Sequence, residues 1–291
     1  ILQLLNLRLG TSISGELQIR HSLTPDELLS GKFPTKMNFQ EVVSGGGINV
    51  LPPTISSQDG EVFVEVESKD ERRAFAVMKK FATGGKLGWV RGAFCEEVST
   101  EKMLPQKEDP DEWFSAERLM RWVLEKFGYS IRFTKSSLNV SDPLILAARK
   151  HNAWFFSGYT VSTNTHLTWK FPLGTPVPTG CDLTIENNIG KMNLPRTWHR
   201  ECRIFIEQLE SGEISCRERY SGEIGIHRRL FLSGLKNATI HFLRDTQFPE
   251  SLVRFQKDDA YLGEGTLVST IENRPNIFTA IGVTGSLLIS W

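Results

Sequence analysis

From residue 129 to the end of the chain, apolar residues recur at every second position in short segments that are separated by turn residues. This period of two is typical of β-strands that bury one face. Strand signals about 8–12 residues apart favour an antiparallel sandwich or jelly roll over a parallel sheet. The strands predicted in this half are residues 129–134, 143–149, 153–160, 165–171, 182–187, 199–208, 213–220, 226–233, 237–243, 251–256, 266–271 and 277–290.

One of these segments also fits a helix. Asp142-Pro143 before the run Leu-Ile-Leu-Ala-Ala resembles a helix start, because proline suits the first helical position. We favour a strand over 143–149, because β-branched and aromatic residues follow at once. The link to the next strand runs through Asn152, a residue type that tolerates the left-handed turn conformation.

The period differs between residues 1 and 128. Residues 61–67 alternate as a strand, and Ser68 with Glu71 then forms the capping box of a helix that Gly84 ends. The apolar stripe of this predicted helix is Ala74, Phe75, Met78, Phe81 and Ala82. Residues 87–98 read as the next strand. A strand, a helix and a strand within about 40 residues have the size of a crossover unit.

A second helix is predicted to begin at Asp109-Pro110 and to end at Gly128, which suits the position just after a helix. Its apolar stripe is Trp113, Ala116, Met120, Val123 and Phe127, spaced as one buried face. The sequence therefore predicts an α+β protein that is predominantly β. Residues 1–128 form a smaller, α/β-containing half with two amphipathic helices, and residues 129–291 form an antiparallel β-sandwich or jelly roll.

Charge and composition limit the classes of partner. Lys+Arg and Asp+Glu number 34 each in 291 residues, so the chain has no net field to hold a polyanion, and we expect no nucleic-acid partner. No segment reaches the roughly 20 apolar residues of a membrane-spanning helix, and residues 1–10 lack the charged start and cleavage site of a signal peptide. We therefore expect no membrane partner. The oligomeric state is left open.

Sequence motifs of catalysis are absent. The chain has no GxGxxG after a strand, no P-loop, no HExxH, no G-x-S-x-G and no CxxC. Its six histidines show no metal-ligand spacing, so we expect neither a metal nor another cofactor. The four cysteines are expected to be free buried thiols, with one structural disulfide as the alternative.

The strongest cluster of polar residues lies on segments 199–208 and 213–220, which we expect to pair as a hairpin. With a four-residue loop Arg203 faces Glu218, and with a two-residue loop at Ser211-Gly212 it faces Tyr220. In either register one face of the first strand is polar and the other apolar. The polar face holds Glu201, Arg203, Phe205 and Glu207, and the apolar face holds Cys202, Ile204 and Ile206. We expect the polar face to look outward or into a cleft.

Two functions fit this pattern. The first is a carbohydrate-active protein that binds or hydrolyses a glycan in a groove on the sandwich, because sugars need polar groups for their hydroxyls and aromatic rings for their C–H faces. Glu201 and Glu218 are the candidate catalytic carboxylates, since cross-strand neighbours lie at spacings that glycosidases use. The candidate binding residues are Trp154, Trp169, Trp198, His199, Arg203 and Tyr220. The alternative is a non-catalytic β-sandwich module that docks a protein partner through a sheet edge or face.

Overall fold

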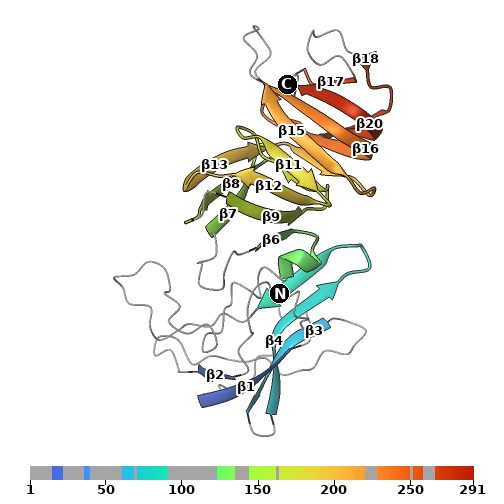
Figure 1. Ribbon diagram of the computed structural model, residues 1–291. Coiled ribbons are helices and arrows are strands. Elements are labelled where there is room, and N and C mark those ends of the chain that lie inside the picture. The colour runs from blue at the N-terminus through green and yellow to red at the C-terminus, as the bar shows by residue number, and fades with distance from the viewer. Residues whose placement is uncertain are drawn as a thin grey trace. The chain divides into compact units, whose positions relative to one another are not determined.

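The computed structural model describes residues 15–21, 36–39, 61–68, 71–90, 123–134, 144–161, 164–219, 228–249, 252–257 and 266–291. The chain divides into two compact units, Ile1–Phe127 and Gly128–Trp291 (Figure 1). Within the described ranges each strand pairing is antiparallel, which confirms the prediction of a predominantly β protein. No helix in this part of the chain is long and apolar enough to cross a membrane.

The first unit contains a sheet with the strand order β2-β1-β3-β4-β5. Its strands are β1 Gly15–His21, β2 Lys36–Phe39, β3 Glu61–Ser68, β4 Glu71–Lys80 and β5 Lys86–Val90. Ala74 and Val77 on β4 are fully buried, and Val62, Leu87 and Trp89 pack against them. The small core of this sheet therefore forms around β4, between its neighbours β3 and β5.

The helix predicted after Ser68 is wrong, because residues 71–80 form strand β4. Ser68 pairs directly with Glu71, so the residues expected to cap a helix instead join two strands of a hairpin. Strand β4 also pairs with β5 along its other edge. Local capping signals contribute about 1 kcal/mol, and a strand paired on both sides with a buried face outweighs them.

The second predicted helix falls mostly on residues 109–122, which lie outside the described ranges. Residues 123–126 are helical, and Phe127 N–H donates to the carbonyl of Val123 at 3.2 Å. Gly128 has φ of +94°, the left-handed conformation expected of the residue that follows a helix. The predicted end of this helix is confirmed.

The second unit is built from short strands and two long ones. Their bounds are β6 Ser130–Thr134, β7 Leu144–Lys150, β8 Ala153–Tyr159, β9 Asn164–Lys170, β10 Thr175–Val177, β11 Leu183–Glu186, β12 Ile189–Asn193, β13 Thr197–Cys202, β14 Ile204–Glu207, β15 Glu213–Arg219, β16 Arg229–Leu243, β17 Arg254–Lys257, β18 Thr266–Leu267, β19 Ile271–Arg274 and β20 Ile277–Ser290. A small sheet has the order β13-β8-β7, and a large sheet runs β18-β17-β20-β16-β15-β11-β12-β9-β6. Strands β14 and β10 branch from β16, and β19 joins β20.

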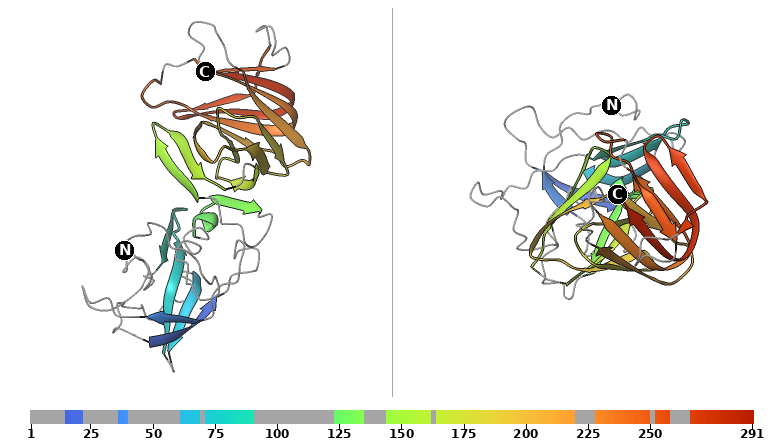
Figure 2. Two further views of the ribbon diagram at one scale, coloured as in Figure 1. Left: turned by 60° about the vertical axis from the view of Figure 1, so that its left-hand side comes forward. Right: turned by 90° about the horizontal axis from the view of Figure 1, so that it is seen from above.

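The long strands β16 and β20 lie side by side (Figure 2). Each also pairs with two shorter strands, β16 with β15 and β14, and β20 with β17 and β19. The first part of β16 pairs with β15 and its second part with β14. The pairing register shifts between Ser233 and Ile240, where Gly234 and Asn237 have positive φ angles of 82° and 46°. Such bulges bend a strand, so β16 changes direction between its two partners.

One apolar core serves both sheets of the second unit. Phe156 and Trp198 enter it from the small sheet, and Leu167, Ile214 and Phe242 enter it from the large sheet. Burial of each such side chain is worth about 1.5–3 kcal/mol. Because the contributors come from segments far apart in sequence, this core holds the two sheets together.

The predicted hairpin between 199–208 and 213–220 is wrong in both registers. The first segment divides at Arg203, with β13 in the small sheet and β14 paired to β10 and β16. Strand β15 pairs with β11 and β16. The loop between β14 and β15 docks on β16, because Lys236 N–H donates to Gln208 Oε1 at 2.8 Å and Lys236 Nζ donates to the carbonyl of Ser211 at 2.9 Å. Strands β14 and β15 therefore each pair with β16, and they do not pair with each other as the hairpin would require.

Candidate functional site

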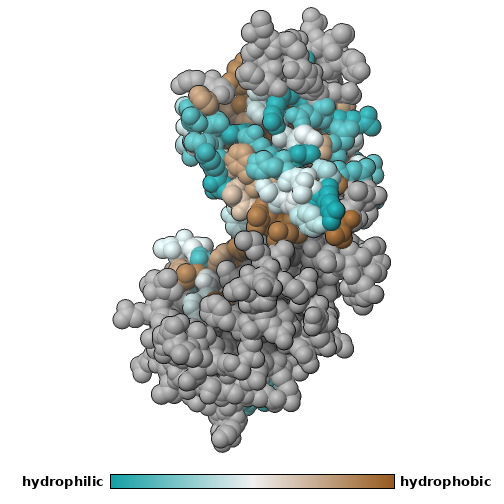
Figure 3. All heavy atoms as spheres, turned by 90° about the vertical axis from the view of Figure 1, so that its left-hand side faces the viewer, coloured by the Kyte–Doolittle hydropathy of each residue, from teal (hydrophilic) through white to brown (hydrophobic). Residues whose placement is uncertain are grey.

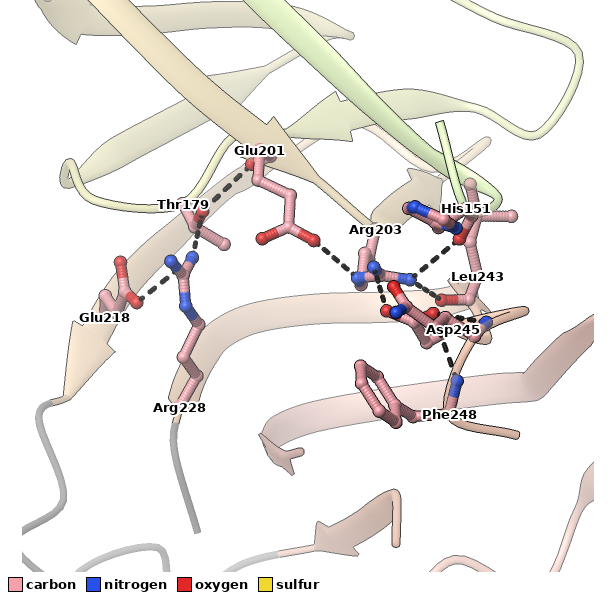
Figure 4. Close-up of polar contacts among 10 residues, drawn as sticks. His151, Thr179, Glu201, Arg203, Glu218, Arg228, Leu243, Asp245 and Phe248 are labelled. Carbon is pink, nitrogen blue, oxygen red and sulfur yellow. Dashed lines mark hydrogen bonds and ion pairs between the residues drawn. The ribbon is translucent and has the colours of Figure 1, made fainter. Parts of the chain in front are cut away.

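The chain passes from the small sheet to the large sheet at Arg203, between β13 and β14. Arg203 is only 7% exposed, which corrects the expectation of an outward polar face. Its Nε donates to Glu201 Oε1 at 2.6 Å, and its Nη2 donates to Asp245 Oδ2 at 2.7 Å (Figure 4). A buried guanidinium requires such partners, since an unpaired buried charge costs several kcal/mol.

Backbone carbonyls complete the surroundings of Arg203. Its Nη1 donates to the carbonyl of Leu243 at 3.3 Å and to that of His151 at 3.5 Å. Leu243 N–H donates in return to the carbonyl of Arg203 at 2.8 Å. One side chain therefore joins the turn after β7, the end of β13 and the end of β16.

Asp245 is fixed by its own chain as well as by Arg203. Its Oδ1 accepts hydrogen bonds from the N–H groups of Gln247 at 2.7 Å and Phe248 at 3.3 Å. Burial acts to raise the pKa of Asp245, but these two donors and the Arg203 charge outweigh burial and hold the pKa below its usual value. Asp245 is therefore a counter-ion at neutral pH.

Glu218 belongs to a second polar cluster. Its carboxylate accepts a hydrogen bond from Gly180 N–H and lies 3.9 Å from Arg228 Nη1. Arg228 Nη1 also donates to Thr179 Oγ1. Thr179 in turn donates to the backbone carbonyl of Glu201, from its N–H at 2.8 Å and its Oγ1 at 2.9 Å. Figure 4 shows that the Glu201 carboxylate points toward Arg203, and that of Glu218 toward Arg228.

The two glutamates predicted as catalytic thus lie in one connected network, but each carboxylate already contacts an arginine. A glycosidase needs one carboxyl group that gives a proton to the leaving group and a second that acts as nucleophile or base. Glu201 lies on β13 of the small sheet and Glu218 on β15 of the large sheet. Glu201 forms an ion pair with Arg203 and Glu218 one with Arg228, so neither carboxylate is without a partner.

The tryptophans predicted to stack on sugar rings lie in or against the core. Trp169 is 1% exposed and Trp198 is 6% exposed. Trp154 is partly buried, and its ring stacks on Phe156 with centroids 6.3 Å apart and planes 12° apart. Protein atoms therefore occupy the faces of Trp169 and Trp198, which corrects their assignment as sugar platforms. Tyr220 lies outside the described residues.

His199 is exposed on the outer face of the small sheet. Its Nδ1 is 2.5 Å from Ser157 Oγ, and its ring lies parallel to that of Phe155 with centroids 5.8 Å apart. Ser157 and His199 are directly opposite on paired strands, so this contact is a cross-strand pair. A catalytic Ser–His pair also needs a third group that orients the histidine. The nearest candidate along the strand, Glu201, is bound to Arg203 instead.

The described cysteines are not suited to nucleophilic chemistry. Cys181, Cys202 and Cys216 are free, whereas Cys95 lies outside the described ranges. Complete burial raises the pKa of the Cys202 and Cys216 thiols far above the usual value, so both stay protonated. Burial also raises the pKa of Cys181, against the opposing charge of Arg200. Among the residues that the structure describes, no group of His, Cys, Asp and Glu side chains could hold a metal ion.

A groove of about 510 Å³ opens over β11, β12 and β15. Thr184 on β11 lies in its middle, opposite Lys191 on β12 and Ser215 on β15. The alternate residues Leu183 and Ile185 point into the core. The groove therefore lies on the outer face of the large sheet, on side chains that three paired strands hold at fixed spacing.

A second row of polar side chains borders the groove. Asp182, which precedes β11, is flanked by Asn193 and Arg217 on the neighbouring strands, and all three are exposed. Lys191 is engaged, because its Nζ lies 2.6 Å from Glu186 Oε2. Side chains of the groove that form no hydrogen bond or ion pair with another described residue are those of Asp182, Thr184, Asn193, Ser215 and Arg217. As far as the described residues show, these groups are available to a ligand.

Strand β12 is not among the strands predicted from the sequence, so the groove that it borders was not predicted either. The signal was present at Asn187-Asn188, where both residues have positive φ angles, of 50° and 64°. Two asparagines between alternating segments indicate a tight hairpin turn. That hairpin places the polar positions of β11 and β12 side by side.

Comparisons with protein-family models, with curated proteins and with solved structures find no match for this chain.

Proposed function

We propose that the protein binds carbohydrate in the groove over β11, β12 and β15 and does not hydrolyse it. The observation that supports this proposal is a row of polar side chains in one groove that form no bond with another described residue. No aromatic ring is among the described residues that line the groove, so a sugar would be held there by hydrogen bonds to its hydroxyl groups. Sugar hydroxyls both donate and accept hydrogen bonds, so a sugar site needs donors and acceptors at fixed positions. The groove volume of about 510 Å³ lies within the range common for small-ligand sites.

Each group of the groove has a defined role in this proposal. The Asp182 carboxylate accepts hydrogen bonds from sugar hydroxyls, and the Arg217 guanidinium donates to hydroxyl or ring oxygens. The side chains of Asn193, Thr184 and Ser215 can both donate and accept hydrogen bonds. Because these side chains stand on paired strands, little chain entropy is lost when a ligand binds.

The absence of hydrolysis is proposed from the state of the two predicted catalytic residues. Glu201 and Glu218 are held by Arg203 and Arg228, and neither lines the groove. Asp182 is the only carboxylate among the groove-lining residues of the described chain. A single carboxylate is insufficient for the two-carboxyl mechanism of most glycosidases.

We also propose that the second unit is a β-sandwich. The bend of β16 gives its two halves different partners, β15 and β14. Ile214 of β15 and Ile206 of β14 both enter the same core. Two sets of strands that share one core are the arrangement of a sandwich, and the groove then lies on an outer face of it.

The test is a glycan-array screen of the purified full chain, followed by titration calorimetry with each glycan that binds. Asp182→Ala and Arg217→Ala are expected to weaken binding at least tenfold, because each removes hydrogen bonds to the sugar. Matched controls are Glu210→Ala and Arg254→Ala, which remove exposed charges away from the groove. Both controls are expected to bind like the wild type.

Three outcomes would overturn the proposal. If the folded chain binds no glycan, the proposed function is wrong. If the groove variants and the controls lose glycan affinity equally, the proposed site is wrong. Hydrolysis of an oligosaccharide that disappears in Glu201→Gln or Glu218→Gln would restore a catalytic role for that pair.

A further inference from the structure

Strand β7 forms one edge of the small sheet and exposes apolar residues. It pairs with β8 on one side, and no other strand of the described chain pairs with it. Leu144 is 40% exposed and Leu146 is 61% exposed, and Ala147 and Ala148 are exposed as well. The side of the second unit that carries this sheet is otherwise mostly hydrophilic, with apolar residues in separate patches (Figure 3).

The free edge of β7 offers backbone hydrogen-bonding groups in a known register. His151 and Asn152 have φ angles of 48° and 66°, as a two-residue turn with two left-handed residues requires. Such a turn closes with a hydrogen-bonded pair, here Lys150 and Ala153. Because hydrogen-bonded and non-hydrogen-bonded pairs alternate, the N–H and C=O groups of Ala147 and of every second residue on either side of it point outward.

The charged residues of β7 are all cationic and lie at one end of the strand. Leu144–Lys150 contains no acidic residue, and both of its cations, Arg149 and Lys150, lie at its C-terminal end. Arg149 donates to Asn152 Oδ1, whereas Lys150 forms no side-chain bond with another described residue. Cationic residues protect many sheet edges from pairing with other strands. On β7 the first five residues, 144–148, carry no charge and lack this protection.

We propose that the free edge of β7 binds an extended segment of a partner protein, which adds as an antiparallel strand. The segment begins with two acidic residues opposite Lys150 and Arg149, and apolar residues opposite Leu146 and Leu144 follow. Backbone hydrogen bonds along the edge supply affinity, and the side chains set the register. The interaction is independent of carbohydrate binding, because β7 contributes nothing to the groove.

Charge decides between this partner and a second copy of the chain. Two β7 strands paired antiparallel around Ala147 would place Lys150 opposite Leu144 and Arg149 opposite Ile145, so neither cation would meet an acidic group. Parallel pairing would bring the cations of both copies together, which is unfavourable. A segment with an acidic start satisfies both cations and covers the apolar residues.

The test uses two fluorescent peptides with the purified full chain, Glu-Glu-Val-Thr-Val-Thr-Val and Lys-Lys-Val-Thr-Val-Thr-Val, with anisotropy as the readout. The acidic peptide is expected to bind the wild type about tenfold more tightly at low salt, with a smaller preference at high salt. Lys150→Glu is expected to remove the preference, because the new carboxylate then offsets the charge of Arg149. Lys257→Glu makes the same charge change at an exposed position of β17 and is expected to leave the preference unchanged.

A backbone variant separates edge pairing from simple charge attraction. Ala147→Pro removes an outward N–H and is expected to abolish binding of both peptides, while hydrogen exchange in β8 and β13 stays as in the wild type. Several results would overturn the proposal. They are a wild type that binds neither peptide, equal affinity for both, a preference that Lys150→Glu does not change, or a chain that sediments as a dimer which Ala147→Pro dissociates.

Discussion

The guanidinium of Arg203 donates to the carboxylate of Asp245 at 2.7 Å, although 42 positions separate the two residues in sequence. Arg203 marks the point at which the chain leaves the small sheet, and Asp245 follows the end of β16 in the large sheet. The pair therefore ties the two sheets together at one edge of the core. Two carboxylates and the carbonyls of Leu243 and His151 give the buried guanidinium of Arg203 four hydrogen-bond acceptors, so the loss of this side chain is costly.

Arg203→Met is expected to lower the free energy of unfolding by about 3–5 kcal/mol, because it leaves Asp245 and Glu201 without their cation. Urea denaturation followed by circular dichroism measures the change. Arg254→Met, at an exposed position of β17, is the control and is expected to stay within about 0.5 kcal/mol of the wild type. A loss no larger than that of the control would contradict the structural role of Arg203.

Asp245 is expected to make the stability of the fold sensitive to acid. Its pKa is lower in the folded protein than in the unfolded chain, so its stabilisation is complete above the unfolded value of about 3.9 and disappears as pH falls through the folded pKa. Unfolding free energies measured from pH 6 to pH 2 report this. Asp245→Asn is expected to show a shallower fall below pH 4, and a slope identical to that of the wild type would refute the assignment.

His241 is expected to make the stability of the fold depend on pH in a higher range than Asp245 does. Burial lowers its pKa below the usual value, and its Nδ1 lies 2.9 Å from Thr279 Oγ1. As pH falls below about 6.5, the unfolded chain binds a proton that the folded chain does not bind, so stability decreases. His241→Gln is expected to flatten the curve between pH 7 and pH 5. Titration of the histidine ring by NMR gives the pKa directly, and an ordinary or raised value would contradict this account.

Gly158→Ala is expected to destabilise the small sheet by roughly 1–3 kcal/mol or more, as overpacking of a core does. A Cβ atom at this position would lie 2.4 Å from the ring of buried Trp198. Thermal unfolding measures the loss, and tryptophan fluorescence reports movement of the ring. Combined with Trp198→Leu, the substitution is expected to cost less than the sum of the two single changes. Strict additivity would show that the contact is not the cause.

Glu201→Gln and Glu218→Gln are expected to reduce stability by about 1–3 kcal/mol each. The first weakens the bond to Arg203, and the second weakens the bonds to Gly180 N–H and Arg228. Glycan affinity is expected to stay within twofold of the wild type, since neither residue lines the groove. Denaturation and calorimetry on the same preparations separate the two effects. A variant with normal stability and lost glycan affinity would move the binding site to that residue.

The alternation of apolar and polar residues by itself determined most of the strands in the second unit. Residues 153–160 were predicted and Ala153–Tyr159 is observed, and the strand predicted at 277–290 matches β20. The turn expected at Asn152 has the left-handed conformation that this residue type tolerates. Strand formation on a half-buried surface is a local property, so the period of two is sufficient to reveal it.

Only the tertiary structure decided which strands pair and which side chains are buried. Residues 71–80 carry helix signals but form β4, because pairing with β3 and β5 outweighs local capping. Arg203 is buried because β13 and β14 belong to different sheets, and the groove exists because β11 lies between β12 and β15. These outcomes depend on contacts between segments far apart in the chain, whose free energies exceed the local preferences that a sequence pattern reports.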